Sequence, residues 1–296
     1  MAASPDSAAA APEQPCYCSL LNFLLTVGRL KKLKRTGWVL SEVRDPETVA
    51  EHSFRAGICA FLIGADPQSA KLIQEKKLDR NKCIKMALVH DLAEALAGDI
   101  TPHCGVSAEE KRKREREALQ AILRPLPFAG VSSLLSCDVC RKPEQEVAAE
   151  AASPLLAVGE EIRSLWEDYE AGTSEEAKFV FDIDKFEMVL QAFEYESDPT
   201  QEGPASGPFY YRAQEEEEGP REEAKETDER KADKPQTTRS GDRKKRRLLM
   251  PTFYRSTLNV FRTDLFKALD RVLRKRRDTL PQVQRAALLE KENGGQ

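Results

Sequence analysis

Apolar residues recur every three or four positions along most of this chain, and no stretch alternates apolar and polar residues convincingly, as a half-buried strand does. The first apolar stripe runs from Leu20 to Leu30, and another runs from Leu258 to Val272. Ser174 is expected to cap the longest helix, over about residues 175–196. The pattern therefore predicts an all-α fold built as a helical bundle.

Composition indicates that only part of the chain forms a core. Hydrophobic residues make up 40% of the 296 residues and charged residues 32%, so some segments cannot bury enough apolar surface to fold. The expected organisation is a disordered N-terminal tail (1–18), a globular domain (19–196) with an irregular insertion (125–157), a charged disordered linker (197–250), an amphipathic helix that packs on the domain (251–278) and a C-terminal tail (279–296).

Several functional classes are excluded by what the sequence lacks. It has no run of eighteen apolar residues and no basic, then apolar, N-terminal leader, which argues against a membrane protein or a secreted one. The seven cysteines are scattered and odd in number, as in an intracellular protein, cytoplasmic or nuclear. The net charge of -4 argues against nucleic acid as a partner, and we interpret the basic run 243–247 as a solvated linker. The pair Cys137 and Cys140 has no second pair with which to bind zinc.

The first candidate for chemistry is the pair His90 and Asp91. Asp79 is expected to cap a helix that continues to Gly98, and on it Asp91 shares the apolar face of Leu88 and Ala95. A carboxylate on an apolar face is costly unless it has a positive partner, and a metal ion is such a partner. The alternative for His90 is an ordinary core or surface histidine. The presence of Glu94 four residues after His90 favours the interpretation of His90 as a metal ligand.

Two further helices carry candidate ligands. Thr48 and Glu51 have the spacing of a capping box, which starts a helix with His52 in its first turns. In the helix after Ser174, Asp184 lies on the same face as the apolar residues Val180, four positions before it, and Met188, four positions after it. It therefore has the same need for a positive partner. The alternative is an ion pair with Lys or Arg, and Asp182 is the second candidate acid there.

The order of these residues, together with longer stretches around them, resembles the HD-domain superfamily of metal-dependent phosphohydrolases. Within it, the chain is most similar to the 5′-deoxynucleotidases of the eukaryotic HD domain-containing protein 2 group. The stretches that carry the resemblance are residues 35–39 (RTGWV), 46–53 (PETVAEHS), 87–94 (ALVHDLAE), 98–100 (GDI) and 177–180 (AKFV).

The resemblance implies a metal centre in the core of the bundle and an enzyme that hydrolyses deoxyribonucleoside monophosphates. It also implies that the chain can form a homodimer. The implied ligands of one tightly bound divalent cation are His52, His90, Asp91 and Asp184. Glu94 and Asp99 are implied to act on the nucleophilic water or, with the carbonyl of Ile100, to hold a second cation. Mixed imidazole and carboxylate ligands suit Mn²⁺, Co²⁺, Fe²⁺ or Zn²⁺, whereas acids alone suit Mg²⁺ or Mn²⁺.

The substrate contacts are expected at Arg35 and Trp38. The guanidinium of Arg35 can pair with a phosphate, and the indole of Trp38 can pack on a sugar or base. The alternatives are a solvated basic patch and a core aromatic residue. Arg55 is a weaker candidate for the phosphate contact.

Two other functions remain open from the sequence. One is an HD-domain phosphohydrolase of another nucleotide class, and the other is a non-catalytic, metal-stabilised helical interaction protein. A structural metal site needs only its four ligands, so the further presence of Glu94 and Asp99 favours catalysis.

Overall fold

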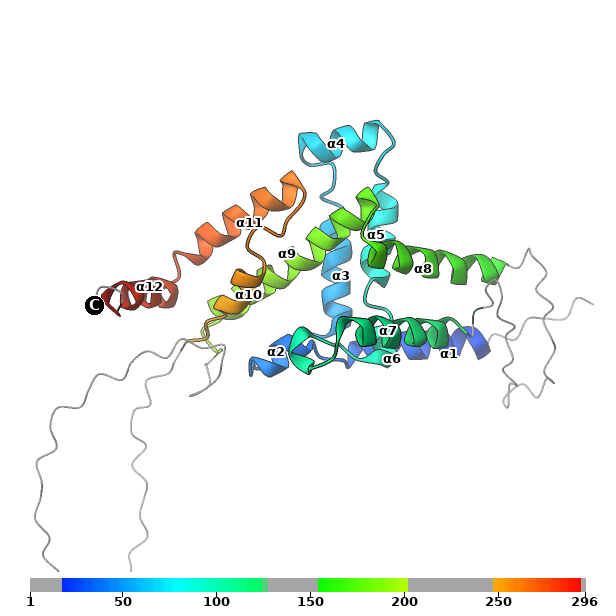
Figure 1. Cartoon of the computed structure of the whole chain (residues 1–296), viewed down its shortest axis with the longest axis horizontal. Coiled ribbons are helices and arrows are strands. Elements are labelled where there is room, and N and C mark those ends of the chain that lie inside the picture. The colour runs from blue at the N-terminus through cyan, green and yellow to red at the C-terminus, as the bar shows by residue number, and fades with distance from the viewer. Residues whose placement is uncertain (1–17, 125, 127–153, 202–246, 294–296) are drawn as a thin grey trace, which may run out of the picture. The chain divides into compact units, whose positions relative to one another are not determined.

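The computed structural model describes residues 18–124, 126, 154–201 and 247–293. Every regular element in these ranges is a helix, and Lys34 and Thr48 form an isolated antiparallel bridge (Figure 1). The prediction of an all-α fold is confirmed. Within the same ranges, no helix combines the length and the apolar character needed to cross a membrane.

The helices fall into two compact units, which are described separately. The first holds the described residues up to 36 and from 47 to 183, and the second holds 37–46 and those from 184 onward. The first contains α1 (Cys18–Val27), η1 (Gly28–Lys31), α3 (Val49–Ala60), α4 (Pro67–Gln74), α5 (Arg80–Val89), α6 (Glu94–Ala97), η2 (Pro102–Cys104), α7 (Ala108–Leu123) and α8 (Pro154–Ala171). The second contains α10 (Pro251–Ser256), α11 (Asp264–Arg277) and α12 (Pro281–Asn293), while α2 (Thr36–Leu40) and α9 (Glu175–Ser197) cross the division.

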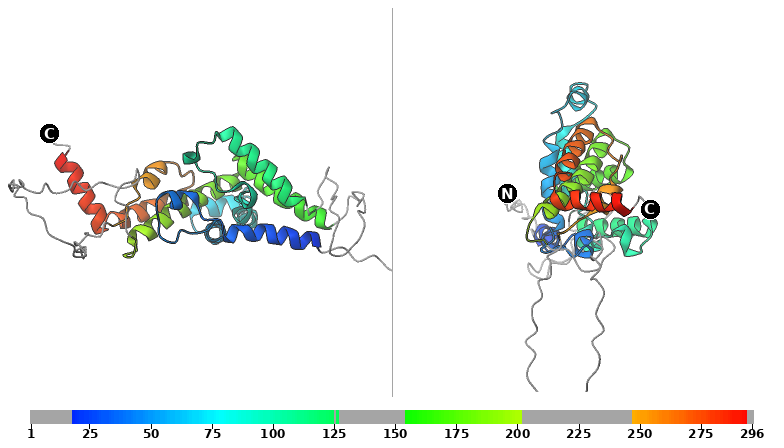
Figure 2. Two further views of the ribbon diagram at one scale, coloured as in Figure 1. Left: turned by 90° about the horizontal axis from the view of Figure 1, so that it is seen from below. Right: turned by 90° about the vertical axis from the view of Figure 1, so that its left-hand side faces the viewer.

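The core of the first unit positions the ends of α3 and α5. These two helices pack along each other, and α5 also packs on α8 (Figure 1). Figure 2 shows α7 alongside α8. One cluster of buried apolar side chains joins η1, α3, α6, α7 and α8, and its members are Leu30, Val49, Leu92, Ala93, Ala95, Ala118, Leu119, Ile122, Leu123, Leu126 and Trp166.

In the second unit, one buried carboxylate organises the C-terminal helices. Glu196, near the end of α9, accepts hydrogen bonds from the Met250 amide (2.6 Å) and from the Arg277 guanidinium (2.7 and 2.9 Å). Its carbonyl accepts a bond from the Gln282 side chain (2.6 Å). Because a buried charge is tolerated when it is fully paired, these bonds fix α10, α11 and α12 on the second half of α9.

The structure corrects the helix expected from Asp79 to Gly98. Asp79 does cap α5, but that helix ends at Val89, and a short α6 begins at Glu94. Between them, bonds from each amide to the carbonyl three residues earlier replace the α-helical pattern, as at Leu92 and Glu94. Leu88, in the last turn of α5, is exposed, so it shares no buried face with Asp91.

Three helices, α2, α4 and α12, lie where the sequence predicted none, and α2 replaces an expected loop at residues 35–38. In α4, Pro67 is the first residue and Asp66 caps it, a combination that could have been read from the sequence. α12 starts at Pro281, in the segment expected to be a tail. The expected helix over 251–278 is divided into α10 and α11, since Thr263 stands in extended backbone at the start of α11.

Other domain boundaries fall mostly outside the described residues. This is true of the expected tail up to Tyr17, of 127–153 in the expected insertion, and of 202–246 in the expected linker. The cysteine pair Cys137 and Cys140, and the basic run up to Arg246, also lie outside them.

Candidate metal centre

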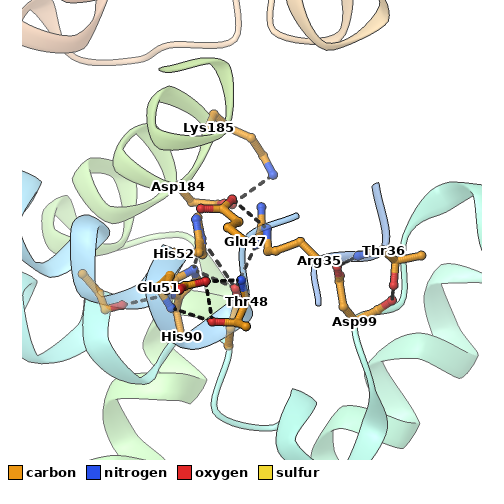
Figure 3. A network of polar contacts seen from close by, with 12 residues as sticks. Arg35, Thr36, Glu47, Thr48, Glu51, His52, His90, Asp99, Asp184 and Lys185 are labelled. Carbon is orange, nitrogen blue, oxygen red and sulfur yellow. Dashed lines mark hydrogen bonds and ion pairs between the residues drawn. The ribbon is translucent and has the colours of Figure 1, made fainter. Parts of the chain in front are cut away.

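The capping box of α3 places His52 in the candidate centre. The Thr48 hydroxyl accepts a hydrogen bond from the Glu51 amide (3.2 Å), and the Glu51 carboxylate accepts one from the Thr48 amide (2.6 Å). These reciprocal bonds start α3 at a fixed residue, which is what the sequence predicted. His52 follows one turn later and is fully buried (Figure 3).

His90, at the end of α5, presents a nitrogen lone pair to His52. Its Nδ1 lies 2.8 Å from the carbonyl oxygen of Ala87. A carbonyl can only accept, so Nδ1 carries the proton and Nε2 of a neutral His90 carries the lone pair. Nε2 lies 3.3 Å from Nε2 of His52 (Figure 3). Two buried imidazoles that meet at their Nε2 atoms can share a metal cation.

Asp91 completes a three-residue cluster. Its Oδ2 lies 3.2 Å from Nε2 of His90 and 3.6 Å from Nε2 of His52. The ligand atoms of all three residues lie within 4.8 Å of one another, so the cluster could hold a metal ion. Burial alone would raise the pKa of Asp91, but the positive charge of the two histidines in their protonated form and of the Arg35 guanidinium outweighs it and holds that pKa below its usual range.

Arg35 reaches this cluster from the segment before α2. Its Nη1 lies 3.3 Å from Oδ2 of Asp91, and its Nε lies 3.8 Å from the Glu47 carboxylate. The Arg35 amide also donates to the Glu47 carbonyl (3.0 Å), next to the Lys34–Thr48 bridge. The structure thus brings the expected phosphate contact to the candidate metal ligands.

Glu94 lies beside the cluster at the start of α6. The side chain is buried, and in the described part of the chain its Oε2 has no hydrogen-bond partner. Burial, together with the charges of Asp91 and Asp99, raises the pKa of Glu94 well above its usual value. A buried acid without a partner beside two other acids is suited to exchange a proton or to bind a cation.

Asp99 follows Gly98, the residue that ends α6. Its Oδ2 accepts a hydrogen bond from the Thr36 amide (2.6 Å), and its carbonyl accepts one from the Thr36 hydroxyl (2.7 Å; Figure 3). The next residue, Ile100, is buried. Its carbonyl as a ligand stays a prediction.

The two candidate ligands on α9, Asp182 and Asp184, fall on opposite sides of the division between the units. Asp184 belongs to the second unit, and its Oδ2 lies 3.0 Å from Nζ of Lys185. That contact is the ion pair expected under the alternative interpretation. Asp182 belongs to the first unit and is fully buried. The role of Asp184 as a metal ligand stays a prediction.

Trp38 lies in an aromatic cluster of the second unit. Its ring centroid is 4.4 Å from that of Phe253 and 5.4 Å from that of Tyr195. The side chain is only 1% exposed, which is the placement that the core interpretation predicts. The contact of Trp38 with a sugar stays a prediction.

The pair Lys111 and Glu115 in the first unit was not among the residues expected from the sequence. On α7, Oε1 of the buried Glu115 lies 3.4 Å from Nζ of Lys111. Burial raises the pKa of Glu115 to about 7, because it outweighs the attraction of Lys111. The spacing of Glu115 from Ala118, Leu119 and Ile122 places it on the apolar face of α7 and could have revealed it.

Comparison with known proteins identifies the family. A family model described as HD domain matches residues 27–225, more than half of the chain. This chain therefore belongs to the HD-domain family.

Three proteins that are similar in sequence to this chain are named as enzymes. The 5′-deoxynucleotidase HDDC2 of Homo sapiens is 39% identical over 178 residues, which cover 60% of this chain and 69% of that protein. The 5′-deoxynucleotidase hdd1 of Schizosaccharomyces pombe is 38% identical, covering 60% and 73%. The 5′-deoxynucleotidase HDDC2 of Dictyostelium discoideum is 40% identical, covering 61% and 80%.

Glu115 should make stability depend on pH. Between its ordinary pKa of 4.5 and about 7, the folded protein holds a proton on Glu115 that the unfolded chain has released. The free energy of unfolding should therefore fall as pH rises through this window and level off above it. In Glu115→Gln the fall should be smaller by on the order of 1–3 kcal/mol.

Urea unfolding from about pH 5 to about pH 8 measures this difference. Glu117→Gln, an exposed change on the same helix, is the matched control and should follow the wild type. Parallel curves for Glu115→Gln and the wild type would show that Glu115 titrates as an exposed acid.

Proposed function

We propose that this chain is a metal-dependent 5′-deoxynucleotidase, which hydrolyses deoxyribonucleoside 5′-monophosphates to deoxynucleosides and phosphate. The observation that carries the proposal is the convergence of His52, His90 and Asp91 beside the unpartnered acid Glu94. The names of the relatives support the same activity. A non-catalytic metal site would not need Glu94 there.

The proposed ligands of the tight cation are His52, His90, Asp91 and Asp184, and the proposed cation is Mn²⁺, Co²⁺, Mg²⁺ or Zn²⁺. The two neutral imidazoles and the carboxylate of the described cluster fit such an ion by their chemistry. A bound divalent cation supplies Lewis acidity at the phosphoryl group. A second ion at Glu94, Asp99 and the Ile100 carbonyl is part of the proposal.

The residues of this chain would act as follows. Arg35 pairs with the phosphate through its guanidinium, which already lies among the ligands. In its ionised form, Glu94 accepts through Oε2 a proton from the attacking water as the water oxygen bonds to phosphorus. The bond from phosphorus to the 5′-oxygen breaks, and that oxygen takes up a proton to give the deoxynucleoside.

A phosphate-release panel tests the activity. Deoxyribonucleoside and ribonucleoside monophosphates, triphosphates and cyclic nucleotides are compared across Mg²⁺, Mn²⁺, Co²⁺ and Zn²⁺. We expect deoxyribonucleoside monophosphates to be the best substrates, and Glu94→Gln to lower turnover on the order of 10²–10⁴-fold. Glu109→Gln, an exposed change on α7, is the control and should behave as wild type.

Other outcomes of the panel identify the alternatives. Hydrolysis confined to triphosphates or cyclic nucleotides would assign the chain to another class of HD-domain enzyme. Bound metal without hydrolysis of any nucleotide would favour the non-catalytic interpretation. Full turnover in Glu94→Gln would move the proton transfer to Asp99.

Asp184 and Asp182 form a matched pair for the fourth ligand. Both are buried acids on α9, two residues apart. Asp184→Asn should weaken Mn²⁺ binding by more than about tenfold, because a ligand charge is lost, whereas Asp182→Asn should leave it unchanged. Calorimetric titration of the metal-free proteins measures both affinities. The reverse result would assign the ligand to Asp182.

We also propose that the protein is a homodimer that pairs through α3. Five large apolar side chains at this helix and the adjoining α5 are 45% to 66% exposed, namely Phe54, Ile58, Phe61, Leu62 and Leu88. Phe54 stands four residues before Ile58 within α3, and Leu62 stands four residues after it, in the turn that follows the helix, so two antiparallel copies of this segment can pair about Ile58. In such a pair the same patch of each copy contacts the other, as in a twofold-symmetric dimer. This self-complementarity favours a second copy of the chain over an unrelated protein as the partner.

The size of this surface is adequate for a dimer. With about 150–250 Å² for a whole aromatic side chain, the five residues expose on the order of 500 Å² per copy. Two copies would then bury about 1,000 Å², the lower limit for a stable interface.

Sedimentation equilibrium of the full chain tests the dimer. The wild type should be a dimer at about 10 μM and Ile58→Glu a monomer, because two charges would meet at the centre of the interface. Leu258→Glu, at an equally exposed leucine of the second unit, should remain a dimer. A monomeric wild type, or a dimeric Ile58→Glu, would contradict this interface.

A further inference from the structure

The dipeptide Arg35 and Thr36 connects the segments that carry the candidate catalytic groups. Arg35 binds Glu47 through its amide and Asp91 through its guanidinium. Thr36 binds Asp99 twice, once through its amide and once through its hydroxyl (Figure 3). These partners are separated from the dipeptide by as many as 63 residues, so the bonds define tertiary structure.

The hydrogen bond from the Thr36 amide makes the two carboxylate oxygens of Asp99 differ. At 2.6 Å it is a short bond from a backbone amide to a carboxylate, which is among the stronger kinds of hydrogen bond. It occupies one of the two lone pairs of Oδ2. The other oxygen, Oδ1, accepts no hydrogen bond within the described part of the chain, so both of its lone pairs are available to a ligand.

The backbone before Asp99 does not set this orientation by itself. Gly98 ends α6 with a φ of 80°, in the left-handed region, so the helical geometry of α6 does not extend to Asp99. The hydroxyl of Thr36 holds the Asp99 carbonyl at 2.7 Å, and the amide holds the carboxylate. Both contacts to this segment come from one residue.

We propose that Thr36 is a positioning residue, which fixes Asp99 so that Oδ1 is its working oxygen. The inference rests on the proposed function, since the work of Oδ1 is in the phosphohydrolase reaction. Thr36 itself does not touch the reacting atoms. It acts through Asp99, and its position next to Arg35 couples the placement of the acid to that of the phosphate contact.

Three substitutions separate the two bonds. Thr36→Ser keeps both, and Thr36→Val removes only the hydroxyl. Thr36→Pro removes the amide donor and the hydroxyl together. Proline is well tolerated at the first residue of a helix, and Thr36 is the first residue of α2. Thr26→Val, which removes a hydroxyl bond within α1 (2.9 Å), is the matched control.

The experiment is a double-mutant cycle between Thr36→Pro and Asp99→Ala, read by steady-state kinetics on a deoxyribonucleoside monophosphate. A misplacement of about 1 Å can cost up to about 10²-fold in rate, so kcat of Thr36→Pro should fall roughly 10- to 100-fold. KM should change little, because Arg35 remains. Thr36→Val should show a smaller loss in kcat, and Thr36→Ser and Thr26→Val should match the wild type.

The decisive result is non-additivity. If Thr36 acts through Asp99, Thr36→Pro should have no further effect on kcat in the Asp99→Ala background. Thermal unfolding and Mn²⁺ titration accompany the kinetics, and Thr36→Pro should keep the fold and the tight cation. Additive losses, or a loss confined to KM, would overturn the proposal. A wild type that hydrolyses no nucleotide would instead reject the proposed function, and this inference with it.

Discussion

One carboxylate oxygen, Oδ2 of Asp91, is the point on which the candidate centre depends. Two imidazole nitrogens and a guanidinium nitrogen lie within 3.6 Å of it, and they come from α3, from the end of α5 and from the segment before α2. Burying a carboxylate and two imidazoles is costly unless their polar atoms are matched. The surrounding fold therefore has to hold three separate segments in register, through the capping box of Thr48, the bridge to Lys34 and the packing of α3 on α5.

The break between α5 and α6 gives this centre its acids. A continuous helix would place Asp91 and Glu94 on one regular surface, whereas the tight turn after Val89 buries Glu94 beside Asp91. Gly98 then releases the chain from α6, and Asp99 is oriented by Thr36. The irregular backbone places three carboxylates within a nine-residue stretch, and their mutual repulsion favours a cation. This is the physical reason for proposing a divalent metal here.

The buried carboxylates of the two units differ in how fully they are hydrogen-bonded. In the second unit every oxygen of Glu196 meets a donor, so this buried charge serves packing. In the first unit Glu94 has no such donor in the described residues, and Glu115 is held with a raised pKa. Carboxyl groups left without full pairing reduce stability, and they are retained where a site uses them.

The sequence by itself determined the helical class and the starts of α3, α5 and α9, because caps and apolar periodicity are local signals. It also identified the pair His90 and Asp91 as candidate metal ligands. It also indicated that Asp91 needed a positive partner. Only the tertiary structure decided that α5 stops at Val89, that Trp38 is packed by Phe253, and that Thr36 binds Asp99. Each of the last two joins residues far apart in the chain, and no local pattern encodes such a contact. The break at His90 replaces helical hydrogen bonds that the sequence pattern of α5 would have continued, and tertiary contacts override such local preferences.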